Sequence, residues 1–281
     1  MMDDAAHALA GSLKDLGEGY LVVVSGAGVS LASGIPTFRG SDPDAVWHRD
    51  VTELGTFRYF REDPVGSWRW YMERFDRVLD KQPNPAHFAL AAIERWHVER
   101  GGRFVLITQN VDPLHERAGS ERLVKVHGSA DRVRCTTSGC VNAAPAGSMR
   151  RAEVDMHRFE ADPSALTLPR CPVCDGLLRQ HVLWFDECYD DHHDYQWQRV
   201  QGAAAGMDFA LFVGTSFAVG VTDMLLQSGL HRAVPLRAID PGAEAPPHPD
   251  VRLLREPAER LLPEVCARLG ITIDAGGDGA G

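Results

Sequence analysis

The sequence predicts an α/β protein with a doubly wound parallel sheet, interrupted once by a small cysteine-bearing module. Short apolar runs alternate with helix-length segments over most of the 281 residues, a pattern typical of parallel strands joined by crossover helices. Each apolar run ends in polar or glycine residues, and ligands of such sheets bind beyond the carboxyl ends of the strands. The stretch 129–178 breaks this rhythm and contains both close cysteine pairs.

Five runs have the length and β-branched composition of buried parallel strands. They are Tyr20–Val24, Phe104–Ile107, Leu123–Val126, Phe209–Val213 and Leu236–Ile239. Helices are expected at Trp68–Leu79, whose apolar residues recur at i, i+3 and i+4, and at Pro85–Arg100 and Val221–His231. We therefore expect the sheet domain over residues 1–128 and 179–273, a zinc-binding module at 129–178, and a disordered tail rich in Gly, Ala and Asp at 274–281.

Composition excludes several broad classes of protein. Lys and Arg number 29 against 39 Asp and Glu, a formal net charge of −10, so direct nucleic-acid binding, which needs a basic surface, is not expected. No apolar run reaches the roughly 18 residues that a membrane span needs. The first residues carry acidic side chains, unlike a secretory signal. We expect a cytoplasmic protein without a membrane partner, and the oligomeric state is not predicted.

Two close cysteine pairs predict a structural metal site. Cys135 and Cys140 have four residues between them, and Cys171 and Cys174 have two. Four thiolates suit one tetrahedral zinc ion and leave no coordination position open. The alternative is four free buried thiols, or one oxidised pair.

A glycine turn, Gly26-Ala27-Gly28, follows the first predicted strand. Glycine there lets backbone N–H groups approach a pyrophosphate, and a following helix N-terminus adds a favourable dipole. The motif is weak by itself, because Leu31 stands where a third glycine is usual. The alternative is a tight turn between a strand and a helix.

Longer motifs give this turn a context. The strings G-A-G-V-S-L-A-S-G-I-P-T-F-R-G (Gly26–Gly40) and T-Q-N-V-D-P-L-H-E-R-A-G (Thr108–Gly119) resemble signatures of the sirtuin family of NAD-dependent protein deacylases. Val126–Gly128, the cysteine pairs, Trp184–Glu187 and Gly214–Ser216 follow in the family's order. The resemblance implies a Rossmann-like domain and a small zinc module, with NAD and an acyl-lysine protein or peptide between them. It implies a deacetylase or deacylase that releases nicotinamide and O-acyl-ADP-ribose.

The resemblance also implies roles for residues at the strand ends. His127 matches the family's general base, and an imidazole titrates near neutral pH. Asn110 and Asp112 match residues of the nicotinamide pocket and are expected to be catalytic with His127. The expected NAD contacts are Gly26, Ala27, Gly28, Phe38, Arg39, Gln109, Asn110, Asp112, Gly214, Thr215, Ser216 and Asp240. Taken alone, each polar residue is a candidate strand-end cap and His127 a candidate core histidine.

The segment Val182–Glu187 resembles the strand with which the family pairs its substrate. The expected substrate contacts there are Val182, Leu183, Trp184 and Phe185. The alternative is a core strand with a buried tryptophan.

Tyr71 and Arg74 look like the pair with which desuccinylase-type sirtuins hold an acidic acyl group. They are three residues apart on a predicted helix and so share a face, and a guanidinium can bind a carboxylate in bidentate fashion. A core tyrosine beside a solvated arginine fits the same spacing. The acyl group therefore stays open between acetyl, other short acyl groups, and succinyl or malonyl.

Three residues depart from the family's pattern. Pro113 stands where glycine or asparagine is usual and removes a backbone donor from the nicotinamide loop. Asp186 replaces a glycine in the substrate strand, and Asp240 stands where asparagine often contacts a ribose. The acidic segment after Glu187 is also unusual: it is either a solvated loop or an attraction for basic substrates.

Two other functions fit the same scaffold. Mono-ADP-ribosyl transfer or NAD hydrolysis would cleave nicotinamide without capture by an acyl group. His127 argues against both, because only deacylation clearly needs that base. A non-catalytic NAD-sensing scaffold would not need Asn110, Asp112 and His127 together.

Overall fold

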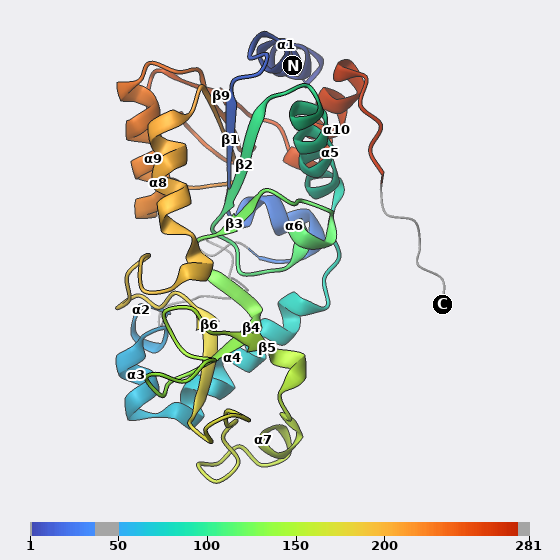
Figure 1. Ribbon diagram of the computed structural model, residues 1–281. Coiled ribbons are helices and arrows are strands. Elements are labelled where there is room, and N and C mark those ends of the chain that lie inside the picture. The colour runs from blue at the N-terminus through green and yellow to red at the C-terminus, as the bar shows by residue number, and fades with distance from the viewer. Residues whose placement is uncertain (1, 37–50, 275–281) are drawn as a thin grey trace.

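The computed structural model describes residues 2–36 and 51–274, which form a large parallel sheet and a smaller antiparallel one (Figure 1). The large sheet has the strand order β3-β2-β1-β7-β8-β9. Its strands are β1 (Tyr20–Ser25), β2 (Arg103–Thr108), β3 (Leu123–Lys125), β7 (Phe209–Val213), β8 (Leu236–Ile239) and β9 (Val251–Leu254). All five predicted strands lie in this sheet, which confirms the Rossmann-like fold, and β9 adds an edge strand that we did not predict.

Helices cover both faces of the large sheet (Figure 1). One layer contains α1 (Met2–Asp15), α5 (Pro85–Glu99) and α10 (Ala258–Leu269), and the other contains α8 (Trp197–Gly206) and α9 (Gly220–His231). Side chains of β1 alternate between the layers: Leu21 and Val23 pack on the first, Val22 and Val24 on the second. Burial on both faces is why these strands are continuous apolar runs in the sequence.

The segment after β1 is a 3₁₀ helix, η1 (Ala27–Ser33), where a helix N-terminus was expected. It ends at Gly34, whose φ of 78° lies in the left-handed region. Asn84 caps α5 through its side-chain oxygen, which accepts from Ala86 N, and Pro85 occupies the first turn. The Asn84 amide also donates to Val29 O (2.8 Å), so the start of α5 holds η1 in place.

The smaller sheet has the antiparallel order β5-β4-β6. Its strands are β4 (Gly128–Cys135), β5 (Met149–Arg150) and β6 (Leu178–Val182), and near them lie α2 (Val51–Leu54), α3 (Phe57–Glu62), α4 (Pro64–Leu79), η2 (Arg151–Glu153) and α7 (His157–Ala161). One hydrophobic cluster joins Phe60, Trp68 and Phe75 of α3 and α4 to Val133 and Leu178 of the sheet. The predicted module 129–178 thus packs against an earlier segment, a partnership that the sequence did not predict; the module's bounds stay a prediction. We call this assembly the small lobe.

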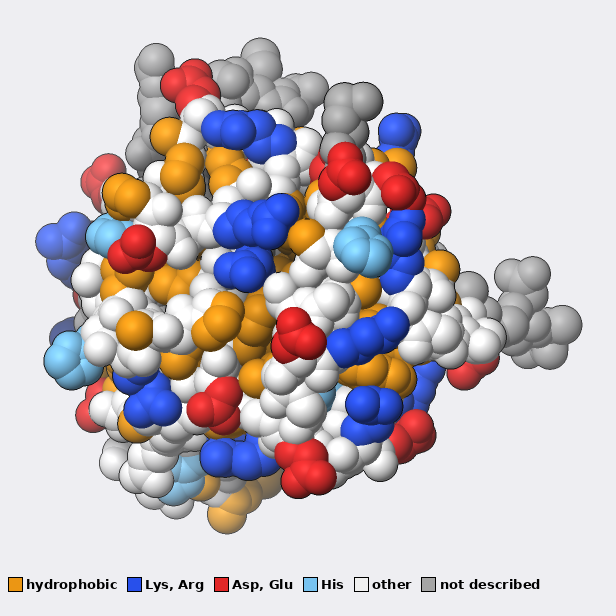
Figure 2. Space-filling model, turned by 90° about the horizontal axis from the view of Figure 1, so that it is seen from above, with side chains coloured by type: hydrophobic (Ala, Val, Ile, Leu, Met, Phe, Trp, Pro, Cys, Tyr) orange, Lys and Arg blue, Asp and Glu red, His pale blue; other side chains and the backbone are white. Residues whose placement is uncertain are grey.

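The remaining short elements are α6 (Leu114–Arg117) and η3 (His193–Tyr195). In the part of the chain that is described, no helix combines the length and apolarity needed to cross a bilayer. The end of the large domain away from the small lobe mixes basic, acidic and apolar side chains (Figure 2). Neither positive nor negative side chains therefore dominate this face. The expected tail beyond residue 274 lies outside the described residues.

Candidate active site

Two glycine turns meet at the carboxyl ends of β1 and β7, where the strand order of the sheet reverses. Gly26 N donates to Val213 O (3.0 Å), and Gly28 N donates to Gly214 O (2.9 Å). A Cβ on Gly28 would lie 2.7 Å from Gly214 Cα, and Gly214 has a φ of +58°. Glycine is required here because the turns touch each other. The N–H groups of Gly26 and Gly28 are used between the turns, so close packing of the turns is the role that the structure gives these glycines.

Asn110 and Asp112 follow β2 and face Ser30 of η1. The Ser30 hydroxyl donates to Asp112 Oδ2 (3.0 Å), while Asn110 Nδ2 donates to Ser30 Oγ (3.1 Å) and Gly26 O (3.2 Å). Leu114 N donates to the other Asp112 oxygen (3.1 Å). Burial raises the pKa of Asp112, against the opposing effect of these hydrogen bonds. Sequence reasoning missed Ser30, although it stands inside the first motif.

Gln109 links the ends of three strands. Its side-chain amide donates to Thr215 Oγ1 (3.0 Å) and Ser25 O (3.3 Å). Thr215 is buried and Ser216 is exposed. Asp240, after β8, accepts from Gly242 N (2.9 Å), so its carboxylate closes its own turn. Two other expected NAD contacts, Phe38 and Arg39, lie outside the described residues.

His127 lies in the turn between β3 and β4. Its Nδ1 is 2.8 Å from Gln109 O, and a carbonyl oxygen only accepts, so Nδ1 carries the proton. Burial lowers the pKa of His127, against the opposing effect of the Gln109 hydrogen bond. The ring is therefore neutral near pH 7, with its lone pair on Nε2. That atom lies 3.3 Å from the hydroxyl of Tyr189, a residue that the sequence did not single out.

Pro113 is accommodated without a lost hydrogen bond. It is the N-cap residue of α6, with φ −93° and ψ 19°, and its carbonyl accepts from Arg117 N (3.0 Å). An N-cap N–H has no partner within its helix, so proline costs little there. Lys125 Nζ donates to Asp112 O (2.9 Å) and pairs with Glu116 (2.8 Å), which fixes the same loop.

Only Val182 of the segment expected as the substrate strand, Val182–Glu187, lies in a strand, so a strand over the rest of that segment was a wrong prediction. β6 ends at Val182, and the chain then turns, with Glu187 N donating to Trp184 O (3.0 Å). Val182 and Trp184 are buried, whereas Phe185 is 50% exposed. Leu183 N donates to His127 O (3.0 Å), which ties this segment to the site. Trp184 packs into the aromatic cluster of the small lobe, so its side chain is part of that core.

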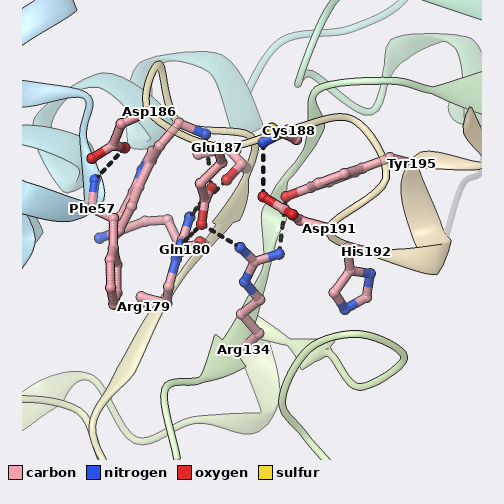
Figure 3. Close-up of polar contacts among 12 residues, drawn as sticks. Phe57, Arg134, Arg179, Gln180, Asp186, Glu187, Cys188, Asp191, His192 and Tyr195 are labelled. Carbon is pink, nitrogen blue, oxygen red and sulfur yellow. Dashed lines mark hydrogen bonds and ion pairs between the residues drawn. The ribbon is translucent and has the colours of Figure 1, made fainter. Parts of the chain in front are cut away.

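Asp186 caps a helix. Its carboxylate accepts from Phe57 N (2.7 Å) and Arg58 N (3.0 Å), the first donors of α3 (Figure 3). Phe185 N also donates to Gly55 O (3.0 Å). The side chain that departs from the family's glycine is therefore occupied by the start of α3.

Tyr71 and Arg74 lie in different surroundings on α4. Tyr71 is buried and stacks on Trp184 with ring centroids 6.2 Å apart, and burial raises the pKa of its hydroxyl. The Arg74 guanidinium lies 4.1 Å from the centre of the Trp70 ring, and its Nη1 donates to Trp70 O (2.9 Å). Trp70 also meets Tyr71 edge-on at 4.6 Å. The pair is thus joined through Trp70.

A buried ion-pair network lies beside this segment (Figure 3). Glu187 Oε1 is 2.8 Å from Arg134 Nη2 and also pairs with Arg179, while Glu187 Oε2 accepts from Trp184 N (2.9 Å). Burial raises the pKa of Glu187, but Arg179 and Arg134 outweigh it and hold the pKa below its usual range. Arg134 Nη1 donates to Tyr195 OH (3.0 Å). Sequence reasoning named Glu187 only as part of a motif and missed both arginines.

The four paired cysteines come together. Cys135 and Cys174 have sulfurs 3.5 Å apart, and those of Cys140 and Cys171 are 3.7 Å apart. All four sulfurs lie within 4.8 Å of one another. A tetrahedron with bonds of about 2.3 Å has edges of about 3.8 Å, so the donor set fits one zinc-sized ion. The unpaired Cys188 is exposed and Cys266 is buried.

The fold and site define a Rossmann-like protein with two glycine turns at the switch point of its sheet and a cysteine module. A model of the Sir2 family matches residues 26–221. An NAD-dependent protein deacylase of Thermus thermophilus is 40% identical over 70% of this chain and 69% of its own length. The Pseudomonas aeruginosa NAD-dependent protein deacylase 1 is 37% identical over 88% of this chain and 93% of its own. A solved Sir2 homologue–NAD complex is 37% identical, with a TM-score of 0.74 over 92% of this chain and 93% of its own.

The chain belongs to the Sir2 family. This confirms the resemblance stated from the motifs and the expectation of a sirtuin-type enzyme.

Proposed function

We propose that this enzyme removes acyl groups from lysine side chains of proteins or peptides, with NAD as its second substrate. The relatives named above are NAD-dependent protein deacylases, and one of the solved relatives is an NAD complex. The observation that carries the proposal is the arrangement of His127. Its Nδ1–H is fixed on Gln109 O, next to Asn110, so a neutral base with a lone pair on Nε2 adjoins the residues matched to the nicotinamide pocket.

The chemistry gives each group a task. Once the bond between ribose and nicotinamide breaks, the acyl oxygen of the substrate captures the ribose carbon. A ribose hydroxyl must then lose its proton before it can attack the imidate carbon. His127 Nε2 accepts that proton, and the hydrogen bond from Nδ1–H to Gln109 O stabilises the imidazolium that forms. Asn110 and Asp112 orient the nicotinamide and ribose groups.

The remaining NAD contacts follow from the strand ends. We place the adenosine diphosphate portion against Ala27 and the Gly214–Ser216 turn, since these follow β1 and β7 at the switch point of the sheet. Gly26 and Gly28 shape that turn, Gln109 is placed beside the ribose, and Asp240 stays a proposed ribose contact. Phe38 and Arg39 complete the proposed set from the resemblance alone.

The acyl group is proposed to be a short one. Tyr71 is buried in the aromatic cluster, and the Arg74 guanidinium lies over Trp70, so Arg74 decides between neutral and acidic chains. If its guanidinium binds substrate carboxylate, succinyl or malonyl is preferred. If it stays on Trp70, acetyl and other neutral groups are preferred.

The four cysteines are proposed to hold one structural zinc ion. Their sulfur–sulfur distances of 3.5 and 3.7 Å suit a tetrahedral site. When bound, zinc would tie β4 to the segment before β6, and four thiolates leave no position for catalysis at the metal. A cytoplasmic location also stays a proposal.

The test is turnover of one lysine peptide carrying acetyl, butyryl, lactyl or succinyl, followed by mass spectrometry. We expect NAD-dependent deacylation that is lost in His127→Ala while NAD binding, measured by calorimetry, persists. Nicotinamide release without acyl peptide would support NAD hydrolysis or ADP-ribosyl transfer instead. NAD binding without any turnover in the unaltered enzyme would support a scaffold.

Arg74→Ala decides the acyl class. Selective loss of succinyl removal establishes the acidic clamp, and an unchanged panel leaves a neutral-acyl enzyme. Arg77→Ala is the matched control, because Arg77 lies one turn further on α4 with its side chain 69% exposed.

A further inference from the structure

Tyr189 lies in the acidic segment that departs from the family's pattern, and none of the roles above uses it. The segment around it is anchored on both sides (Figure 3). On one side Glu187 is held by Arg134 and Arg179. On the other, Cys188 N donates to Asp191 Oδ2 (2.7 Å). Tyr189 is therefore carried by a fixed turn.

The Tyr189 ring is held by aromatic contacts on both sides. It stacks on Trp197 of α8 at 4.4 Å with an interplanar angle of 12°, and it lies nearly parallel to the His127 ring at 5.9 Å. Burial raises the pKa of the Tyr189 hydroxyl, and the backbone N–H of Val221, in the first turn of α9, opposes that rise. The partial positive charge of a helix N-terminus makes a hydroxyl there a better donor.

The direction of the Tyr189–His127 hydrogen bond follows from the other ring nitrogen. Because Nδ1–H is committed to Gln109 O, Nε2 of the neutral ring can only accept. The Tyr189 hydroxyl, 3.3 Å away, must therefore donate to it. Nε2 has one lone pair, so a substrate hydroxyl and the Tyr189 hydroxyl cannot both donate to it along that direction.

We propose that Tyr189 is a positioning residue for His127, whose hydroxyl holds Nε2 as an acceptor in the substrate-free enzyme and gives way to the substrate hydroxyl in the complex. This inference rests on the proposed function for the identity of the substrate hydroxyl. The contact between Tyr189 and His127 is independent of the proposed function.

Charged groups near His127 are directed elsewhere. Asp112 bonds Ser30 and Leu114 N, and Lys125 bonds Asp112 O and Glu116. On the loop, Glu187 is neutralised by its two arginines, and the side chains of Cys188, Asp190 and Asp191 form an exposed group. Tyr189 is thus the titratable side chain that contacts the His127 ring among the described residues.

The first test measures the His127 ring directly, without catalysis. Imidazole ¹⁵N shifts are followed by NMR against pH in the full-length, NAD-free protein, and the His127 signal is identified by its loss in His127→Ala. A hydrogen bond donated to Nε2 stabilises the neutral ring, so Tyr189→Phe should raise the pKa of His127 by about 0.5 to 1 unit. An unchanged titration would overturn the proposal.

The second test separates the free enzyme from the complex. The pH dependence of kcat/KM reports groups of the free enzyme, and that of kcat reports the complex. Tyr189→Phe should move the acid limb of kcat/KM upward by the same shift and leave that of kcat in place. Equal shifts in both profiles would mean that the Tyr189 hydroxyl stays on Nε2 in the complex, which contradicts the exchange.

Tyr195→Phe is the matched control. It removes the hydroxyl that accepts from Arg134 and loosens the same loop without touching His127. If it moves the His127 titration as Tyr189→Phe does, Tyr189 acts only through loop order and the proposal is wrong. An enzyme without deacylase activity would refute the proposed function, while the NMR titration would still decide the contact.

Discussion

The large domain and the small lobe are held together by different interactions. All six residues of β1 are buried, and its apolar side chains pack against helices on both faces of the sheet. The small lobe has an aromatic cluster instead, with four gathered thiols and a buried carboxylate between two arginines. The large domain thus rests on apolar burial, whereas the small lobe also contains buried charges that need counter-charges and a cluster of four cysteines.

This difference matters for catalysis because His127 stands where the chain passes from one part to the other. It follows β3 of the large sheet and directly precedes β4 of the small one. Its neighbours Leu183 and Tyr189 belong to the chain after β6. Changes in the small lobe should therefore reach the base, while the glycine turns stay intact.

The largest effect is expected from the cysteine site. Cys171→Ser, or removal of metal with a chelator, should unfold the small lobe and abolish turnover, because structural zinc sites supply roughly 10 kcal/mol of folding free energy. Metal content and near-UV circular dichroism measure the loss. Cys188→Ser is the control, since Cys188 is exposed and outside the cluster. A metal-free protein with an unchanged spectrum and melting temperature would contradict this comparison.

The next largest loss of stability is expected at Glu187. Glu187→Gln leaves Arg134 and Arg179 buried without their counter-charge, and breaking such a pair costs about 3 to 5 kcal/mol. Denaturant unfolding measures this loss of unfolding free energy, and Asp190→Asn, at an exposed position, is the control.

The stability difference between the unaltered protein and Glu187→Gln should depend on pH in a definite direction. The two arginines hold the folded pKa of Glu187 below its ordinary 4.5, despite the opposing effect of burial. The stabilisation is therefore complete above about pH 4.5 and is lost as the pH falls through the folded pKa. The unfolding free energies of the unaltered protein and Glu187→Gln should therefore become equal in acid. A difference between them that grew as the pH fell would refute the ion-pair account.

Local sequence could predict the sheet but not the small lobe's assembly. Runs such as Phe209–Val213 must be apolar at every position because both faces are buried. β9, Val251–Leu254, escaped prediction because it is a four-residue edge strand with Arg252 exposed. The contact between Tyr189 and His127 spans 62 residues of sequence, and no local pattern marks it. The motifs predicted which residues lie at the strand ends, and the structure added their partners Ser30 and Tyr189.

A smaller effect is expected in the large domain at Gly28. Gly28→Ala places a methyl group 2.7 Å from Gly214 Cα, a backbone atom that cannot turn away. Overpacking of this kind costs about 1 to 3 kcal/mol, and it should weaken NAD binding in calorimetry while the small lobe's metal content stays constant. Gly11→Ala in α1 is the control, because nothing lies within 4 Å of the added carbon. Equal NAD affinity in the two variants would show that the turns need not touch.

The smallest effect is expected at Asp186, where the small lobe meets the segment proposed to bind substrate. Asp186→Ala removes the acceptor for Phe57 N and Arg58 N, and loss of such a helix cap costs about 1 kcal/mol. Because the carboxylate is hydrogen-bonded to the start of α3, the KM for the peptide should change less than twofold. The melting temperature should fall. Asp190→Ala, on the same loop with an exposed side chain, controls for lost negative charge. A large rise in KM for Asp186→Ala alone would mean that the carboxylate contacts the peptide, and the small lobe would then contribute directly to substrate binding.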